Sequence, residues 1–410
     1  MLEQVTMDEI RKRAEAAKNK KPAYGNDINL DKYLHDVPSR ERITTLNELS
    51  SGVRERALTI GLDASEALRS GSFFQHDQSV VISKSMQEGL ELMDINDALE
   101  KYDWLKDYFF KLVQPDADKF TAFSATHKFA GYFIRALPGA KIEFPLQACL
   151  YLGREGMIQN VHNVIIAEEG SELHIISGCT SDVHVTEGLH IGISEFYVKD
   201  NAKITFTMIH NWAENLVVRP RSSTRMGKNA VFMSNYVCMR PVRDIQMYPS
   251  SFMEGENGVA RYNTVVVALK GSHLDLGSKA VLKAKGCRAE LVARAISTGG
   301  YIASRGMIEG DVPDTKAHLE CRGLLLSDQG VIYAVPELKG VVQGVDLSHE
   351  AAVGKINEDE IQYLMARGVD ADTATALIVR GFLDVDIEGL PPALQAEMKK
   401  NIELGEKASM

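Results

Sequence analysis

The chain has 410 residues, 45% hydrophobic and 25% charged, which is typical of a folded protein of two or three domains. Its net charge of −10 argues against a partner such as nucleic acid or an anionic membrane, because both require a basic face. No apolar run approaches the ~18 residues of a membrane span, and residues 1–5 lack the apolar core of a signal peptide. We therefore expect a cytoplasmic protein.

The N-terminal part, residues 1–115, is expected to be mainly helical. Residues 8–16 open with acidic residues and continue with good helix formers, as the helix dipole and intrinsic propensities prefer. A second apolar helical pattern follows Asn96, which we take as its N-cap. One short strand is expected between these helices, at residues 79–83.

Residues 116–347 consist of short β-rich runs that end in small-residue turns. Five turn signals are spaced by 31, 28, 29 and 28 residues: Glu169-Gly170, Asp200-Asn201, Lys228-Asn229, Asn257-Gly258 and Lys285-Gly286. The alternation of polar and apolar residues after each turn is typical of a strand. A β-sandwich also has frequent turns, but it does not continue for so long as one domain. The near-constant repeat therefore favours an all-β core built as a stacked solenoid, a β-helix.

Residues 348–410 return to a helical pattern. One helix is expected to start with the acidic residues after Asn357 and to end at Gly368, a second to cover residues 372–382, and a third residues 393–404. We expect the apolar face of this small C-terminal domain to dock on the end of the solenoid or on a partner chain.

The cysteines are scattered, and the chain contains no Cys-x-x-Cys pattern, which excludes zinc ribbons and ferredoxin-type ligand runs as local motifs. Any metal site must therefore gather its ligands from distant parts of the chain. Three cysteines lie in or beside strand-like runs and are taken as structural: Cys149, Cys238 and Cys287.

Cys321, His349 and Glu350 are candidate ligands for iron or an iron–sulfur cluster, because a thiol, an imidazole and a carboxylate suit this metal. Cys321 and His349 are 28 residues apart, about one turn of the solenoid, so they can stack on neighbouring turns. Arg322 could favour the thiolate of the adjacent cysteine. From spacing alone, an inert buried thiol is the more frequent alternative.

Cys179 and His210 are 31 residues apart, again about one turn, and Trp212 follows closely. By pattern alone, a buried thiol beside a core tryptophan is the simpler interpretation. Four other histidines fall on different strand phases and are expected to be surface or core residues: His162, His174, His184 and His190.

Enzymatic motifs are missing from the sequence. It has neither a nucleotide-binding Gly-x-x-x-x-Gly-Lys-Ser/Thr loop nor a Gly-x-Ser-x-Gly nucleophile elbow, so we expect no ATPase activity of its own. The adjacent carboxylates Glu168 and Glu169 lie beside a turn and are expected to be solvated.

Several segments resemble the SufB/SufD family of iron–sulfur cluster assembly proteins, over nearly all the chain from about residue 102. They include residues 132–139 (YFIRALPG) and 144–147 (FPLQ), Gly178-Cys179-Thr180, and Asn211-Trp212. The most specific string is SHEAAVGKI at 348–356, which continues through EIQYL at 360–364 and Arg367-Gly368.

The resemblance implies a right-handed parallel β-helix flanked by helical domains. It implies a scaffold without its own ATPase motif, on which a transient cluster, [4Fe-4S] in our expectation, forms and passes to acceptor apoproteins. It also implies a SufC-like ABC ATPase that docks on the C-terminal helices. Whether a flavin takes part is left open by the sequence.

The resemblance also assigns residues. Cys321 matches the SufB cysteine implicated in holding the cluster, His349 the histidine near the SufB–SufD dimer contact, and Glu350 the glutamate that follows it. Cys179 matches the cysteine thought to receive sulfur, and Trp212 lies on the sulfur route. The three residues Cys179, Cys321 and Glu350 together favour SufB over SufD.

The chain departs from the SufB pattern in three ways. His210 stands where SufB usually has Gln, Gly330 replaces a second cysteine, and the N-terminal region is shorter. Because a spare ligand is missing, we expect a homodimer through the β-helix in which two chains supply ligands. Two alternatives stay open: a SufD-like structural subunit that holds no cluster, and a β-helix enzyme acting on carbohydrate.

Overall fold

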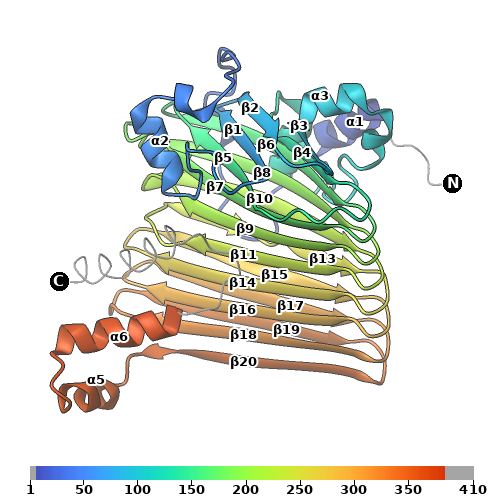
Figure 1. Cartoon of the computed structure of the whole chain (residues 1–410). Helices are drawn as coiled ribbons and strands as arrows, with labels where there is room; N and C mark the ends of the chain where they lie inside the picture. The colour runs from blue at the N-terminus through green and yellow to red at the C-terminus, as the bar shows by residue number, and fades with distance from the viewer. Residues whose placement is uncertain (1–5, 384–410) are drawn as a thin grey trace.

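The computed structural model describes residues 6–383, and its centre is a parallel β-solenoid whose two walls face each other (Figure 1). Sheet I contains, in spatial order, β2 (Ser79–Ser85), β1 (Gly71–His76), β5 (Leu146–Leu152), β7 (Glu172–Ser181), β9 (Lys203–Asn211), β11 (Val231–Cys238), β14 (Val259–Ala268), β16 (Arg288–Ser297), β18 (Thr315–Leu325) and β20 (Val345–Lys355). Sheet II contains β19 (Val331–Gly340), β17 (Tyr301–Gly310), β15 (His273–Leu282), β12 (Asp244–Met247) with β13 (Ser250–Met253), β10 (Asn215–Met226), β8 (Glu187–Val198), β6 (Met157–Ala167), β4 (Tyr132–Ala136) and β3 (Leu90–Asp94).

From β4 to β20 the chain passes between the two sheets, and each strand pairs in parallel with a strand of the neighbouring turn. This confirms the β-helix that the sequence repeat predicts.

The predicted turns stack at one corner of the solenoid. Gly170, Asn201, Asn229, Asn257 and Gly286 all have positive φ angles, the left-handed region that glycine and asparagine tolerate best. The three asparagines also form a ladder, in which Asn229 donates to Asn201 over 2.9 Å and Asn257 donates to Asn229 over 3.2 Å. The repeat therefore has a backbone cause, since each turn requires a residue that accepts a left-handed conformation.

Side chains of one strand phase fill the space between the sheets, which we call the lumen. Most are aliphatic or aromatic and almost fully buried, each contributing about 1.5–3 kcal/mol relative to exposure. A polar ladder runs along the outer face of sheet I, in the strand phase of Ile209, Val237 and Val265: Asn235 donates to the Thr207 hydroxyl over 3.2 Å, and Asn263 donates to Asn235 over 2.9 Å. These polar groups are buried on that face, where they satisfy one another.

The N-terminal region is only partly helical. Its helices are α1 (Met7–Ala17), α2 (Ser51–Leu58), α3 (Ile95–Lys101) and, beyond residue 115, α4 (Lys119–Thr126), with short 3-10 helices at Leu30–Lys32, Leu46–Glu48 and Asp103–Asp107. The predicted strand is confirmed as β2, but β1 and β3, which also extend the two sheets, were not predicted. β1 is buried on both faces, so it shows no alternation. The N-cap of α3 is Asp94 rather than Asn96.

The C-terminal helices begin later than the division at residue 348. That position lies inside β20, and the helices are α5 (Glu358–Met365), capped by Asn357, and α6 (Ala371–Leu383). The third predicted helix, at 393–404, lies outside the described residues. On α6, Val379 and Leu383 join an apolar cluster with Val265, Ile296 and Leu324 on the outer side of sheet I. No helix in the described part of the chain is long and apolar enough to cross a membrane.

Candidate functional site

Cys321 lies near the far end of the lumen. It is on β18, opposite Ala293 and Ala351 on the neighbouring strands, and only 3% of its surface is exposed. The hydroxyl of Ser304, on the opposite sheet, donates to its Sγ over 3.7 Å. Burial raises the pKa of the Cys321 thiol, so at neutral pH the thiol is protonated while the lumen is closed.

His349 shares the inward-facing phase of Cys321. It lies on β20, the last strand of sheet I, opposite the buried Leu319, two positions from Cys321 along the neighbouring strand. His349 is nevertheless exposed, because β20 is the last strand of sheet I among residues 6–383. The structure therefore places Cys321 and His349 on one face at the open end of the solenoid.

Glu350 points to the other side of the same sheet. It aligns with Glu320, and its Oε1 accepts a hydrogen bond from Arg322 Nη2 over 3.0 Å. Arg322 Nε also contacts Glu320 Oε1 at 2.8 Å, and Arg294 pairs with Glu320. In one chain, therefore, Glu350 does not join Cys321 and His349. No group of three His, Cys, Asp or Glu side chains among residues 6–383 is arranged to hold a metal ion.

The expected effect of Arg322 on the thiol was wrong. Successive residues of a strand point to opposite faces, so Arg322 lies outside the lumen while Cys321 lies inside it. The guanidinium is paired with two carboxylates and does not lower the pKa of the thiol, which burial raises.

The second predicted group does come together inside the lumen. Cys179 on β7 lies directly opposite His210 on β9, and the Trp212 ring centroid is 5.6 Å from that of His210. Cys179 is fully buried, with its Sγ 3.7 Å from Met208 Sδ. Burial raises the pKa of the Cys179 thiol and holds the pKa of His210 well below its usual value, so both groups are neutral.

Two members of this group were not predicted. Cys238 on β11 is the next residue in register after His210, and Tyr236 Oη is 2.9 Å from His210 Nδ1 and hydrogen-bonded to the Cys238 thiol. Cys238 follows His210 by 28 residues, so the one-turn spacing that linked Cys179 to His210 could have identified it.

His190 reaches the same place from the opposite sheet. Its ring centroid is 5.1 Å from Trp212, and its Nδ1 is 2.9 Å from Gln159 Oε1. The Gln159 amide group donates to two backbone carbonyls, so Oε1 is the acceptor and His190 carries its proton on Nδ1. Burial lowers the pKa of His190 to about 3. No sequence spacing connects strands of different sheets, so this residue could not be assigned in advance.

His190, His210 and Tyr236 of this group line a cavity of about 60 Å³ that we call the luminal chamber. Its walls include Met208, His210 and Tyr236 from sheet I, His190, Pro220, Ser222, Met247 and Pro249 from sheet II, and Tyr262 and Thr264 further along. A smaller space next to Cys321 shares Thr264 with it. Both predicted cysteines belong to the core cluster between the two sheets.

Comparison with known proteins identifies the chain. Residues 150–382 match the model of the SufBD core domain of the SUF system for FeS cluster assembly. The chain belongs to the SufBD family of iron–sulfur cluster assembly proteins. A SufBD family protein of Methanothermobacter thermautotrophicus is 47% identical over 402 residues, covering 97% of this chain and 98% of the relative. One from Archaeoglobus fulgidus is 51% identical over 354 residues, covering 86% and 95%. SufB of Bacillus subtilis is 27% identical over 408 residues, covering 95% and 86%.

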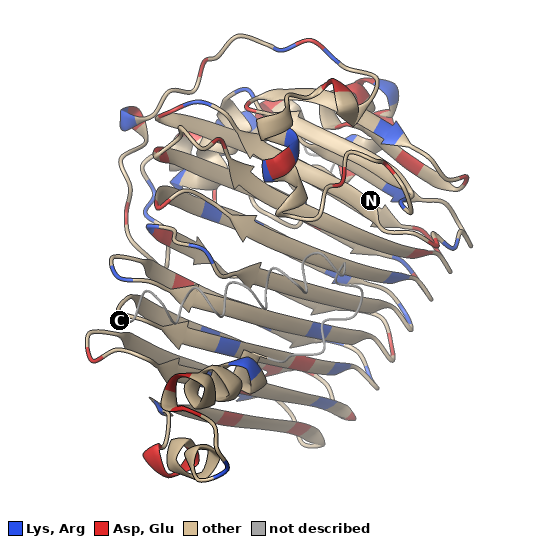
Figure 2. Cartoon of the chain, turned by 60° about the vertical axis from the view of Figure 1, so that its left-hand side comes forward, with Lys and Arg blue, Asp and Glu red and all other residues tan. Residues whose placement is uncertain are grey.

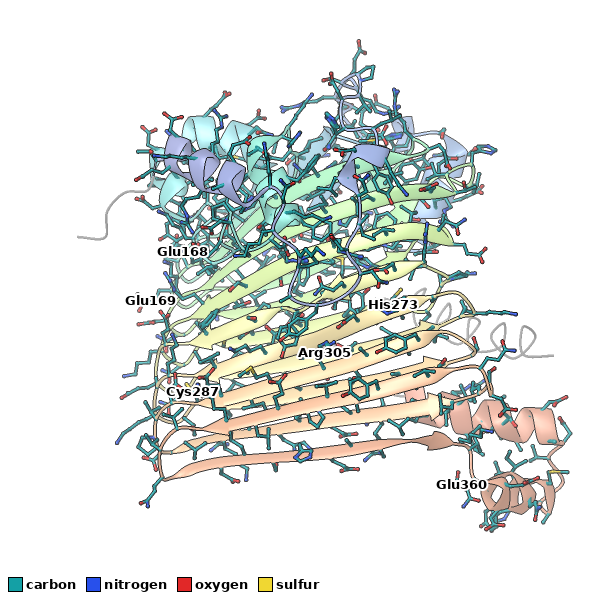
Figure 3. All side chains as sticks on the ribbon, turned by 180° about the vertical axis from the view of Figure 1, so that it is seen from behind. Glu168, Glu169, His273, Cys287, Arg305 and Glu360 are labelled. Carbon is teal, nitrogen blue, oxygen red and sulfur yellow. The ribbon has the colours of Figure 1, made fainter. Side chains whose placement is uncertain are left out.

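A β-helix enzyme acting on carbohydrate would require clustered carboxylates, and Glu168 and Glu169 are the adjacent pair in the sequence. Both lie at the turn edge of the solenoid (Figure 3). Glu168 is partly buried rather than solvated, and its Oε1 is 2.7 Å from Arg135 Nε. On the side shown in Figure 2, acidic and basic residues are interspersed along the described strands and helices.

Proposed function

We propose that this SufBD protein is the scaffold on which an iron–sulfur cluster is assembled, with Cys321 and His349 as ligands. The observation that carries the proposal is their shared face at the open end of the solenoid, where a thiol in the lumen meets an imidazole on the last strand. Thiolate and imidazole are both ligands of iron in clusters. Iron and sulfide are substrates here, and the chain supplies the place where they meet.

We place the arrival of sulfur in the lumen nearer the N-terminal end of the solenoid. Cys179 is the acceptor, and His210 and Trp212 line the route beside it. The support is that Cys179 and Cys321 both face the lumen, where the chamber near His210 and the space near Cys321 have Thr264 as a common wall residue. Enclosure also protects thiols, because oxidation follows exposure and thiolate character.

A second copy of the chain completes the ligand set. Leu338 and Val353 have the inward phase of the strands, yet 37% and 42% of their surfaces are exposed at the open end. Unpaired strand edges invite pairing with another chain, so two open ends joined together would cover these residues and bring two His349 side chains into one interface. Glu350 can join this ligand set only if its carboxylate leaves the ion pair with Arg322.

A SufC-like ABC ATPase acts on the C-terminal helices. Tyr363, Met365 and Leu377 of α5 and α6 are exposed apolar residues that such a partner can cover. ATP-driven clamping of two ATPase subunits would pull on these helices, loosen the joined ends and admit iron to Cys321. The finished cluster then passes to acceptor apoproteins.

The test is anaerobic reconstitution with ferrous iron and sulfide, with iron counted per chain. Unaltered protein is expected to bind iron and Cys321→Ala to lose it. Cys287→Ala is the matched control, because Cys287 is also a buried free thiol but lies at a turn beside Met253 and Gly255. Equal iron on all three proteins would overturn the assignment of Cys321.

A SufD-like structural role without a cluster is the second candidate. It is favoured by the outward position of Glu350, which Arg322 neutralises, and by the lack of a three-ligand group in the described chain. If the unaltered protein binds no iron, alone or with its ATPase, this role replaces the scaffold.

A further inference from the structure

One stretch of the solenoid wall is not paired. β10 follows β8 along its whole length, but on its other side it pairs with β12 only at Val217–Val218 and with β13 only at Ser223–Met226. On both sides of this gap, each β10 residue pairs with a residue of β12 or β13 that is 27 positions later in the sequence. The register is therefore the same before and after the gap. We call this unpaired stretch, between residues 219–222 and 246–249, the eyelet.

Two prolines and two arginines maintain the eyelet. Pro220 and Pro249 have no N–H to donate to a neighbouring strand. Arg221 Nη1 donates to the carbonyls of Pro220 and Gln246 over 2.8 and 3.1 Å, so a side chain replaces the missing ladder bonds. Arg219 is fully buried in an ion pair of 2.6 Å with Asp244, and Arg221 is held by Asp118 at 2.8 Å.

The inner side of the eyelet is the luminal chamber. Pro220 and Ser222 from one strand, and Met247 and Pro249 from the other, line it directly. His210, which lies opposite Cys179, lines the same chamber from sheet I. On the outer side, Arg219 and Arg221 fill the eyelet and pack over the Phe120 ring at 5.5 and 5.4 Å, so these side chains separate the chamber from the solvent side of sheet II.

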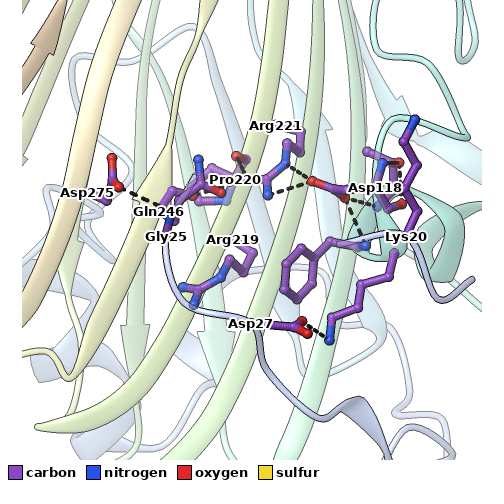
Figure 4. A network of polar contacts seen from close by, with 12 residues as sticks. Lys20, Gly25, Asp27, Asp118, Arg219, Pro220, Arg221, Gln246 and Asp275 are labelled. Atoms are coloured by element: carbon purple, nitrogen blue, oxygen red, sulfur yellow. Dashed lines mark hydrogen bonds and ion pairs between the residues drawn. The ribbon is translucent and has the colours of Figure 1, made fainter. Parts of the chain in front are cut away.

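Residues 20–28, which we call the strap, cover the outer side (Figures 3 and 4). Asn26 Nδ2 donates to Asp244 over 2.6 Å, the backbone N–H of Gly25 donates to Asp275 over 3.2 Å, and Arg219 Nη2 donates to the Asn26 carbonyl over 3.1 Å. Gly25 has a φ of 74°, and a Cβ there would lie 2.4 Å from Gln246 Cγ. The strap thus lies in direct contact with the eyelet.

The strap is held by side-chain contacts rather than by a strand ladder: Asp27 pairs with Lys119, and the Tyr24 ring packs 5.5 Å from that of Tyr248. Most of its residues are exposed, and it forms no helix or strand. Its bonds to the eyelet are few and come mainly from side chains. Segments with little buried apolar surface and exposed backbone open at low free-energy cost, so the strap can leave while the solenoid stays folded.

We propose that the eyelet is a side entrance to the luminal chamber, that the strap is its cover, and that its ligand is hydrogen sulfide. The chamber is sized for a few atoms, and the imidazoles that line it are neutral, so a small uncharged hydride is favoured over an ion. The identity of the ligand rests on the proposed function, whereas the entrance itself does not.

The entrance is tested with methyl methanethiosulfonate, a small neutral reagent that converts a thiol to its methyl disulfide and releases methanesulfinic acid. In full-length Asn26→Ala protein the methylthiolation rate of Cys179, followed by peptide mass spectrometry, is expected to rise about tenfold, the effect of one net hydrogen bond lost from the strap.

Two controls separate strap opening from unfolding. Asn29→Ala removes a hydrogen bond to Asp31 in the same region without touching the eyelet, and should leave the rate unchanged. Cys149, a buried thiol among the apolar residues outside sheet I, is the internal reference. An unchanged Cys179 rate in Asn26→Ala, or an equal rise at Cys149, would overturn the entrance.

The ligand is tested on protein methylthiolated at Cys179. Hydrogen sulfide attacks the disulfide, a new S–S bond forms at Cys179, methanethiol leaves with the proton, and a Cys179 persulfide remains. The rate of methanethiol release should rise in Asn26→Ala by the same factor. If Asn26→Ala speeds the methylthiolation of Cys179 but not the release of methanethiol, hydrogen sulfide is overturned as the ligand. Neither assay uses iron. Both results can therefore be interpreted even if the cluster reconstitution fails.

Discussion

Strand alternation decides the chemistry of single residues in this SufBD protein. Cys321 and Arg322 are neighbours in sequence, yet one lies in the lumen and the other in an exterior ion-pair network. The same rule separates His349 from Glu350. Residues separated by one turn of the solenoid lie on neighbouring strands. Their strand phase, inward or outward, then decides whether their side chains share a face. A ligand set proposed from adjacent residues on a strand must therefore be checked for phase.

The buried imidazole of His190 should make stability depend on pH. Its pKa is about 3 in the folded chain and about 6.5 when unfolded, so between these values the unfolded chain binds more protons. The free energy of unfolding should therefore fall as pH drops below 6.5, by up to about 1.4 kcal/mol per pH unit for this group. Urea unfolding between pH 7 and 4 measures the slope.

The variant His190→Gln removes this titrating group and should flatten the slope. His184→Gln is the matched control, because it removes an exposed imidazole that water already surrounds and should leave the slope as it is. An identical slope in all three proteins would show that burial of His190 does not control acid stability.

At the scale of elements, a glycine allows α2 to dock beside the sulfur-accepting strand. A Cβ on Gly178 would lie 2.3 Å from Ile60 Cδ1, so the segment that follows α2 packs directly on β7. Arg56 of α2 also donates to the Ser181 carbonyl over 2.9 Å. Gly178→Ala should lower the free energy of unfolding by about 1–3 kcal/mol through overpacking. Gly354→Ala, on β20 with no atom within 4 Å of the new Cβ, should not. Equal denaturant midpoints would contradict this contact.

The asparagine ladder allows backbone and side-chain effects to be separated. Asn229→Gly keeps the left-handed turn, whose φ is 52°, but removes the bonds to Asn201 and Asn257. Asn229→Ala removes these bonds and adds a backbone cost of about 1–2 kcal/mol. The alanine variant should therefore unfold at lower denaturant concentration than the glycine variant. The reverse order would mean that the turn does not need its left-handed residue.

The solenoid could be predicted because it repeats locally, with one left-handed turn residue in each of the five turns that the sequence marks. The strand β1 could not, since burial on both faces removes alternation, and the meeting of His190 with His210 could not, since it crosses between sheets. The eyelet could not be predicted from the sequence either. Pro220 and Pro249 are typical strand-breaking residues, and only the register of the structure shows that pairing resumes beyond them.

At the scale of the whole molecule, the two ends of the solenoid differ. The first turns are covered by the N-terminal helices, whereas β19 and β20 end both sheets without a cover of comparable size (Figure 1). Inward-phase residues at this end are exposed because the described part of the chain forms no further turn, and a second copy can supply one. The assembly and the candidate cluster site therefore depend on the same edge.

Dimerisation through the open end predicts that Leu338→Lys weakens self-association at least tenfold. A lysine at this position would place a charge where the partner's strand must pack, and burying an unpaired charge is costly. Val183→Lys is the matched control, since Val183 is 70% exposed between β7 and β8, far along the chain from β19 and β20. Sedimentation equilibrium over a concentration series measures both dissociation constants. Equal values for the two variants, or an unaltered protein that stays monomeric, would contradict the proposed interface. If Leu338→Lys is monomeric and also loses iron in the reconstitution assay, the two chains share the cluster site.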